Sequence, residues 1–204
     1  MKFLKNKIFI GATALILTTF FIIIWSGKNF APSQPLPVFG AIKPFSLVSQ
    51  DNKPFSLSNL KGKIWVVDFI FTSCHGPCPL MTRQMKQLQE HYVNSPDVHF
   101  LSISIDPQTD TPQVLKRYAQ KFSANFSKWT FLTGDLKTIS LLARNSFKLS
   151  SGTPENPSLH TTKFVLLDRS GQIRGYYDSQ DSLLLEKIKA DIQKLQKQKP
   201  HSDL

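Results

Sequence analysis

Cysteine is scarce in this sequence, which has two cysteines and five histidines among 204 residues. Two cysteines cannot supply the four ligands of a structural zinc site without histidines. They form a C-x-x-x-C pair, Cys74 and Cys78, and a disulfide over so few residues would remove little entropy from the unfolded chain. The spacing therefore favours a pair that reacts or binds metal over one that only cross-links the fold.

Acidic residues are also few: 14 Asp and Glu stand against 25 Lys and Arg, and the net charge is +11. A strongly basic protein can bind nucleic acid, but here the basic residues are scattered. No zinc finger, helix-turn-helix or RNP motif is visible. We therefore expect no nucleic-acid partner, and we attribute the charge to a solvated basic surface or to docking with an acidic partner.

Charge is absent from Ile8–Trp25, which is almost wholly apolar. Its length is close to the roughly 20 residues that span a bilayer, and no A-x-A cleavage site or lipid-anchor cysteine follows it. Lys2, Lys5 and Lys7 precede it and stay in the cytoplasm by the positive-inside rule. We expect residues 1–27 to form an uncleaved anchor in the inner (cytoplasmic) membrane, with the soluble domain on the periplasmic or outer side.

The remainder is expected to be a linker and one domain. Residues 28–40 contain three prolines and predict an extended linker. Residues 41–204 show no internal repeat and no sign of a second domain. Within them, Ala41–Leu57 predicts a β-hairpin, because two short apolar stretches flank the polar residues 50–53.

A continuous apolar run leads directly into the two cysteines. Ile64–Phe71 is β-branched or aromatic apart from Asp68, its one charge, and it predicts a strand buried on both faces. A helix is expected to begin near Pro79, because proline is tolerated in the first turn of a helix. The sulfur atoms then lie beside a helix N-terminus, whose partial positive charge favours thiolate over thiol.

The rest of the sequence predicts alternating helices and strands. Helices are expected over Leu80–Val93, Pro112–Phe122, Leu136–Phe147 and Asp181–Gln198, and strands over Val98–Ile105, Trp129–Thr133, Thr162–Leu167 and Gln172–Tyr177. The first core strand, its helix and the next strand form a βαβ unit, and hence a parallel pair. This order predicts a mixed α/β, thioredoxin-like fold with an N-terminal β-hairpin and an N-terminal transmembrane anchor. In such sheets, ligands gather at the carboxyl ends of the strands.

The cysteine pair allows three interpretations. A thioredoxin-type oxidoreductase uses one cysteine to attack and the other to resolve, but it is expected to space them as C-x-x-C. A peroxidase would require one cysteine of low pKa within the sequence surroundings typical of a peroxidase family, and these surroundings are not found. The third interpretation is metal binding, since two thiolates and an imidazole select soft ions such as Cu(I) or Zn(II). A three-coordinate Cu(I) site needs only one histidine more.

Several histidines are candidates for that ligand. His75 lies between the cysteines, where two adjacent side chains would have to turn toward one ion. His91 and His99 fall near a helix end and in a strand, and a fourth histidine lies in the tail. His160 closes an irregular loop directly before a strand. Because a lone loop histidine is more often solvated, its position alone leaves the ligand open.

Three motifs occur together and in order: FTSCHGPCP after an apolar strand, then SISIDPQTDTP, then LHTTKFVLLDRSGQIRGYYD. In these motifs, and in its N-terminal anchor, the sequence resembles the Sco/SenC family of copper chaperones. Members are membrane-anchored thioredoxin-like proteins that help to assemble the dinuclear copper site of cytochrome c oxidase. The resemblance covers the chain from about Phe45 to the terminal helix. It implies copper, as Cu(I) and/or Cu(II), and the copper domain of cytochrome c oxidase subunit II as the partner.

By this resemblance Cys74 and Cys78 match the family's two cysteine ligands, and His160 matches its distal histidine ligand. The sequence thus predicts a metallochaperone that delivers copper to, or prepares the cysteines of, the copper site in subunit II. Two alternatives stay open: a thiol-disulfide oxidoreductase that uses Cys74 and Cys78 as a redox-active pair, and a copper or redox signalling module. The presence of His160 favours metal, since a pure dithiol exchanger has no use for it.

The resemblance also bears on three further residues. Asp106 and Asp110 match the acidic pair of a D-P-x-x-D-T-P loop, which by resemblance shapes the site or the surface for the partner. Many members carry an acidic residue between the two cysteines, whereas this chain has His75, Gly76 and Pro77. His75, Asp106 and Asp110 are therefore candidate auxiliary ligands.

Overall fold

The computed structural model describes residues 17–21, 34–149 and 161–198. The described residues from Leu36 onward form one compact unit. Residues 17–21, within the expected anchor, are helical. Among the described residues, no helix is both long enough and apolar enough to cross a membrane. The rest of Ile8–Trp25, and His160, lie outside the described residues.

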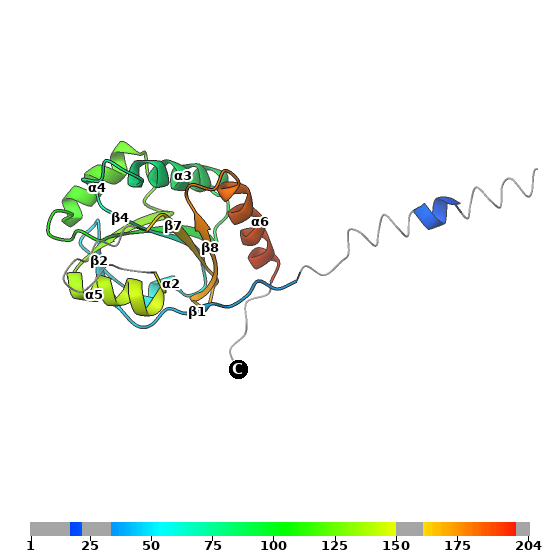
Figure 1. Ribbon diagram of the computed structural model, residues 1–204, viewed down its shortest axis with the longest axis horizontal. Helices are drawn as coiled ribbons and strands as arrows, with labels where there is room; N and C mark the ends of the chain where they lie inside the picture. Colours follow the sequence, from blue (N-terminus) through cyan, green and yellow to red (C-terminus); the bar gives the residue numbers. More distant parts are fainter. Residues whose placement is uncertain (1–16, 22–33, 150–160, 199–204) are drawn as a thin grey trace, which may run out of the picture. The chain divides into compact units, whose positions relative to one another are not determined.

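A mixed sheet forms the centre of this unit, with the strand order β1-β8-β7-β4-β5-β6-β2-β3 (Figure 1). The strands are β1 (Gly40–Ala41), β2 (Ser46–Ser49), β3 (Pro54–Ser56), β4 (Ile64–Ile70), β5 (Val98–Ser104), β6 (Trp129–Thr133), β7 (Lys163–Leu167) and β8 (Gln172–Asp178). Strand β4 is parallel to β5 on one side and antiparallel to β7 on the other. Every residue of β4 is buried, which confirms the predicted central strand and the βαβ unit.

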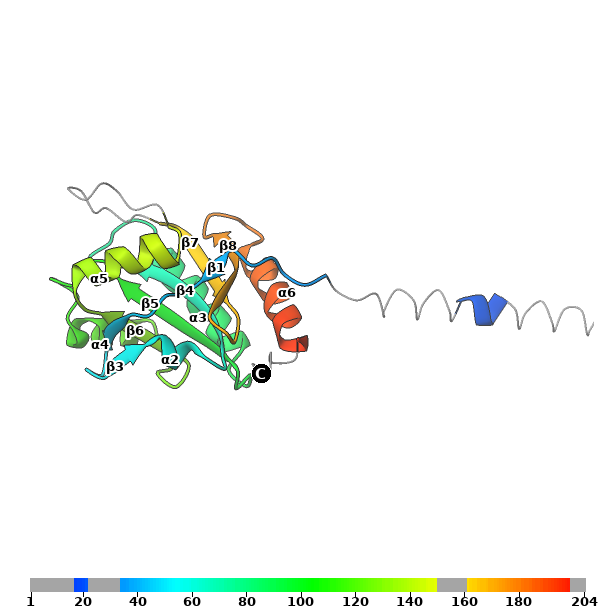
Figure 2. The same cartoon turned by 90° about the horizontal axis from the view of Figure 1, so that it is seen from below.

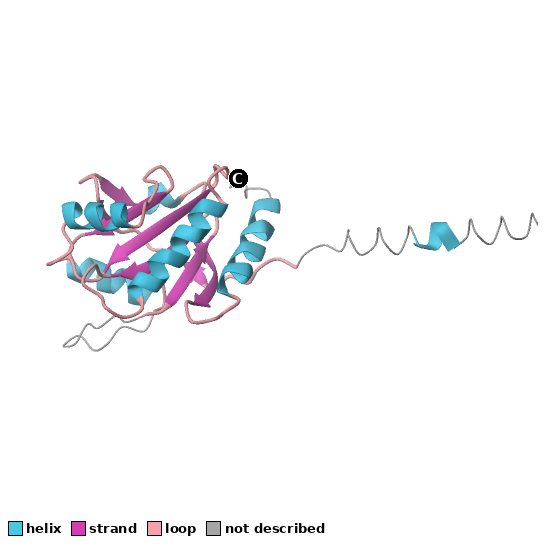
Figure 3. Ribbon diagram, turned by 90° about the horizontal axis from the view of Figure 1, so that it is seen from above, coloured by secondary structure: helices cyan, strands magenta, loops and turns pink. Residues whose placement is uncertain are grey.

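Helices cover both faces of the sheet. They are α2 (Leu57–Leu60), α3 (Cys78–His91), α4 (Pro112–Lys121), α5 (Leu136–Leu141) and α6 (Leu184–Lys197). The face under α5 is seen in Figure 2, and the face covered by α3, α4 and α6 in Figure 3. The result is a three-layer arrangement, as the alternating α/β order predicts.

The sheet separates two hydrophobic cores. The cysteine-side core lies under α3, α4 and α6 and includes Cys78, Met81 and Tyr118. The far core lies under α2 and α5 and includes Phe69 and Phe147. Strand β4 contributes to both, because successive side chains of a strand point to opposite faces.

The two predicted hairpins are confirmed, since β2 pairs with β3 and β7 with β8, each antiparallel. The third predicted helix differs in form: α5 ends at Leu141 and continues as the π-helical turn η1, Leu142–Ser146. With this wider turn, Leu142, Ala143 and Phe147 are all buried in the far core. The short strand β1, which pairs with β8, was not expected from the sequence.

Candidate functional site

Cys74 and Cys78 lie where the chain passes from β4 to α3. Both thiols are free; Cys74 is half-buried and Cys78 is buried. The Cys74 backbone N–H donates to the Phe71 carbonyl at 3.2 Å, which closes a turn immediately after β4. Helix α3 starts at Cys78 with Pro79 in its first turn, as the sequence predicts.

The two thiols are close enough to interact, and their environment favours the protonated form of Cys78. Burial, together with the hydrogen bond with Cys74, raises the pKa of the Cys78 thiol to about 12. A hydrogen bond from the Phe71 backbone acts in the opposite direction. The expectation that the helix N-terminus favours thiolate is therefore wrong for Cys78, because desolvation outweighs the helix dipole. A soft metal ion or an oxidation step would have to displace this proton.

Asp110 lies beneath the turn that leads to Cys74. Its side chain is fully buried, and its carboxylate accepts hydrogen bonds from the Thr72 backbone N–H at 3.1 Å, from the Thr72 hydroxyl and from the Ser104 hydroxyl. Ser104 ends β5, and Thr72 is the second residue after the end of β4. The Asp110 carboxylate thus connects the chain at the carboxyl ends of two parallel strands.

A second polar connection reaches Cys78 from helix α4. The Thr82 hydroxyl donates to the Cys78 carbonyl at 2.9 Å and shares a 2.7 Å hydrogen bond with the Tyr118 hydroxyl. Thr82 is fully buried and Tyr118 is 8% exposed. Neither residue was predicted from the sequence as part of the site, since a threonine and a tyrosine on two helices give no local signal.

The other predicted ligands are distributed unevenly around the cysteines. His75 is exposed, and Asp106 is half-buried in the loop after β5. The Asp106 carbonyl accepts the Asp110 backbone N–H at 2.8 Å, so these two aspartates share one turn. In the described part of the chain, no cluster of three or more Cys, His, Asp or Glu side chains is arranged to hold a metal ion. His160, the predicted distal ligand, lies outside the described residues.

Asp68 is a further ionisable group on the cysteine side of the sheet. Its side chain is completely buried, and neither carboxylate oxygen has a hydrogen-bond partner in the described structure. Burial raises the pKa of the Asp68 carboxyl to about 7. The sequence signal was a single charge inside an apolar strand, and such buried acids are common near functional sites.

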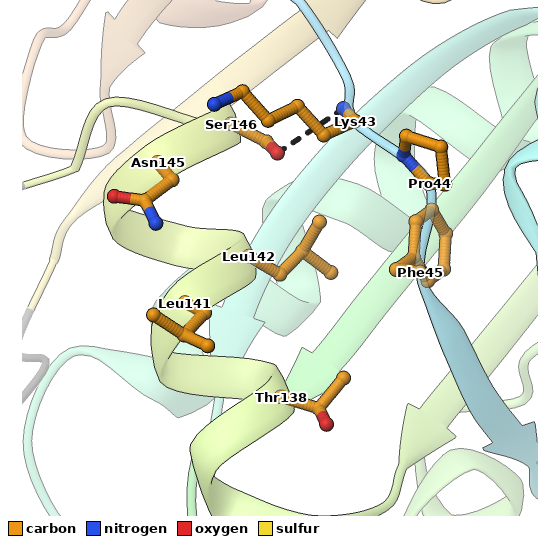
Figure 4. Close-up of a pocket in the computed structure, with 8 residues that line it drawn as sticks. All are labelled: Lys43, Pro44, Phe45, Thr138, Leu141, Leu142, Asn145 and Ser146. Atoms are coloured by element: carbon orange, nitrogen blue, oxygen red, sulfur yellow. Dashed lines mark hydrogen bonds between the residues drawn. The ribbon is translucent and has the colours of Figure 1, made fainter.

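Two grooves in the described surface are lined by residues other than the cysteines. One, of about 190 Å³, lies between residues 43–45 and the α5–η1 segment, where Ser146 Oγ accepts the Lys43 backbone N–H (Figure 4). The other, of about 480 Å³, is lined by Phe39, Tyr176 and the residues that flank the segment 150–160. Neither brings together ionisable groups of the kind found around Cys74 and Cys78.

A pair of neighbouring thiols between a central parallel strand and the first turn of a helix defines a thioredoxin-like dithiol protein. A sequence model described as SCO1/SenC matches residues 37–197, and the chain belongs to the SCO1/SenC family.

Individual relatives agree with this assignment. The chain is 35% identical to the SCO1 protein homolog of Bacillus subtilis over 76% of this chain and 83% of that protein. It superimposes on the solved structure of BsSco, a member of the Sco family of cytochrome c oxidase assembly proteins in which a disulfide switch was identified, with a TM-score of 0.71 and 33% identity. That match covers 81% of this chain and all of the other. Copper-bound ScoI of Arabidopsis thaliana gives a TM-score of 0.63 and 27% identity over 76% of this chain and 99% of that one.

Proposed function

We propose that this protein binds copper and takes part in cytochrome c oxidase assembly. The observation that carries the proposal is the pair of free, neighbouring thiols in a chain of the SCO1/SenC family. Thiolates are soft donors that suit Cu(I). The copper-bound structure of ScoI and the assembly role of BsSco support the same conclusion by similarity.

In this proposal Cys74 and Cys78 supply two ligands and His160 supplies the third. The copper ion is the protein's cargo. The protein either passes this ion to the dinuclear copper site of subunit II or prepares the cysteines of that site to receive it. The apolar stretch Ile8–Trp25 would keep the protein at the inner membrane, with the dithiol on the outer side. Cys74 and Cys78 would then lie on the same side of the membrane as a subunit II copper domain that is exported across it.

The test begins with metal binding by the reduced full-length protein. We expect Cys74→Ser and Cys78→Ser each to abolish tight Cu(I) binding in competition with a Cu(I) chelator, because one thiolate and one imidazole cannot replace two thiolates. We expect His160→Ala to affect mainly the Cu(II) form and transfer. Full Cu(I) affinity in Cys74→Ser would exclude the proposed site.

Transfer is the second part of the test. Protein loaded with Cu(I) is mixed with the reduced, metal-free copper domain of a subunit II, the two are separated, and copper is measured in each. Copper in the acceptor supports delivery. Copper retained by the donor, together with fast reduction of an oxidised acceptor, would favour a thiol-disulfide oxidoreductase, the second candidate. The disulfide switch identified in BsSco makes that candidate worth testing.

A further inference from the structure

The two cysteines are supported by one segment that follows them by some thirty residues. This segment, Asp106–Lys121, consists of the loop after β5 and helix α4. In Figure 1, α4 lies next to α3 on the same face of the sheet. The segment makes a separate hydrogen-bonded connection to the chain beside each cysteine.

The first connection holds the turn that carries Cys74. Asp110 directly precedes Thr111, the N-cap of α4, and its buried carboxylate accepts two hydrogen bonds from Thr72. Thr72 lies inside the turn that the Cys74 backbone N–H closes on Phe71. The orientation of that turn, and with it the position of the Cys74 sulfur, therefore depends on Asp110.

The second connection holds the start of α3. Tyr118, on α4, bonds through its hydroxyl to Thr82, whose own hydroxyl bonds to the carbonyl of Cys78. Hydrogen bonds inside a core are strongly directional and costly to leave unmade. This chain of bonds fixes the first turn of α3, whose first residue is Cys78, relative to α4.

We propose that the loop before α4 and helix α4 together set the distance between the two sulfur atoms, with Asp110 and Tyr118 as positioning residues. Neither residue needs to touch the metal or the target. One continuous segment contacts the chain beside each cysteine, so loss of either contact should lower the effective concentration of one sulfur toward the other. The metal-binding test below rests on the proposed function, whereas the disulfide test does not.

The test compares variants that differ by one hydroxyl. Thr82→Val and Tyr118→Phe remove the connection to Cys78 with little change of volume, while Thr82→Ser keeps the hydroxyl. Tyr177→Phe is the matched control, because Tyr177 is buried in the same core and its hydroxyl bonds instead to Asp191, at 2.8 Å. For the connection from Asp110, Thr72→Val removes the hydroxyl bond and leaves the backbone N–H bond, while Thr72→Ser keeps both.

The first readout is the equilibrium between the dithiol and the Cys74–Cys78 disulfide in mixtures of reduced and oxidised dithiothreitol. Forming the protein disulfide oxidises the two cysteine thiols and reduces one molecule of oxidised dithiothreitol, so the reaction balances. Looser sulfurs have a lower effective concentration toward each other. We expect Thr82→Val, Tyr118→Phe and Thr72→Val to shift this equilibrium toward the dithiol by about three- to tenfold. The serine variants and Tyr177→Phe should stay near the parent.

Urea unfolding of each variant separates positioning from general loss of stability. Tyr177→Phe and Tyr118→Phe should lose similar stability, but only Tyr118→Phe should change the thiol equilibrium. Equal thiol equilibria in these two variants, or equal values for Thr82→Val and Thr82→Ser, would overturn the proposal. Cu(I) competition with the same variants should follow the same order. If the parent binds no Cu(I), the proposed function fails while the disulfide test still decides this inference.

Discussion

The Asp68 carboxylate makes the stability of the protein depend on pH in an unusual direction. Its pKa is about 7 in the folded protein and 3.8 in the unfolded chain, so between these values the folded state binds more protons. Its contribution to stability is therefore full at low pH and is lost as the pH rises toward 7. The slope approaches about 1.4 kcal/mol per pH unit inside this window.

His99 opposes this effect. Burial, together with the charge of Lys63, lowers the pKa of His99 from 6.5 to about 4 in the folded protein. In this window the unfolded chain binds more protons at His99, so its contribution to stability is lost as the pH falls from 6.5 toward 4. The two contributions partly cancel in the parent protein.

We predict that two substitutions tilt the pH profile of stability in opposite directions. Asp68→Asn removes the contribution to stability that decreases as the pH rises, so the free energy of unfolding should increase with pH between about 4 and 6.5. His99→Gln removes the contribution to stability that increases with pH, so the free energy of unfolding should decrease as the pH rises over the same range. The measurement is urea unfolding at several pH values for the parent and both variants. Parallel profiles for all three proteins would contradict this assignment of the two pKa values.

At the scale of elements, strand β8 contains a position that only glycine can occupy without rearrangement. A Cβ on Gly175 would lie 2.4 Å from the Tyr177 hydroxyl oxygen, far inside van der Waals contact. Tyr177 is buried and bonded to Asp191 on α6, so its ring is not free to move aside. The strand therefore relies on this glycine to let the tyrosine ring fold back over the backbone.

We predict that Gly175→Ala lowers the free energy of unfolding by about 1–3 kcal/mol, the usual effect of overpacking. Gly76→Ala is the control, since its Cβ would meet only Cys74 Sγ, at 3.9 Å. The midpoint of urea unfolding measures both. If the two variants lose the same stability, the close contact with Tyr177 is not the cause.

The helices near the cysteines show which parts of an element can be predicted from sequence. Pro112 correctly indicated the start of α4, and Pro79 the start of α3, because a proline in the first turn acts locally. The pKa of Cys78 could not be predicted in the same way. It depends on burial beneath other elements, which the order of residues around Cys78 does not reveal.

In the molecule as a whole, the sheet separates the far core from the core that adjoins the cysteines. The far core and the cysteine-side core lie on opposite faces, and the cysteines adjoin only the second. Phe147, 1% exposed, packs edge to face on Phe69 at 5.2 Å between ring centroids in the far core. Met81, fully buried, lies in the first turn of α3, and its backbone N–H donates to the Pro77 carbonyl.

We predict that Phe147→Ala lowers the free energy of unfolding by about 3–5 kcal/mol but leaves the reaction rate of the thiols with a disulfide reagent unchanged. Met81→Ala should lower stability by about 2–5 kcal/mol and also change that rate, because the cavity lies beside Cys78. Unfolding in urea and stopped-flow thiol kinetics give the two readouts. A changed thiol rate in the well-folded Phe147→Ala protein would show that the sheet does not isolate the site.

Local patterns in the sequence determined the α/β alternation, the buried central strand, both hairpins and the cysteine pair at the start of a helix. These features follow from side-chain periodicity and from proline and turn residues, which act over a few positions. The contacts of Asp110 with Thr72 and of Tyr118 with Thr82 were decided by the tertiary structure alone. They join residues 36 to 38 positions apart, which meet only after parallel strands and their crossover helices have packed. The environment of the two thiols is set by that packing.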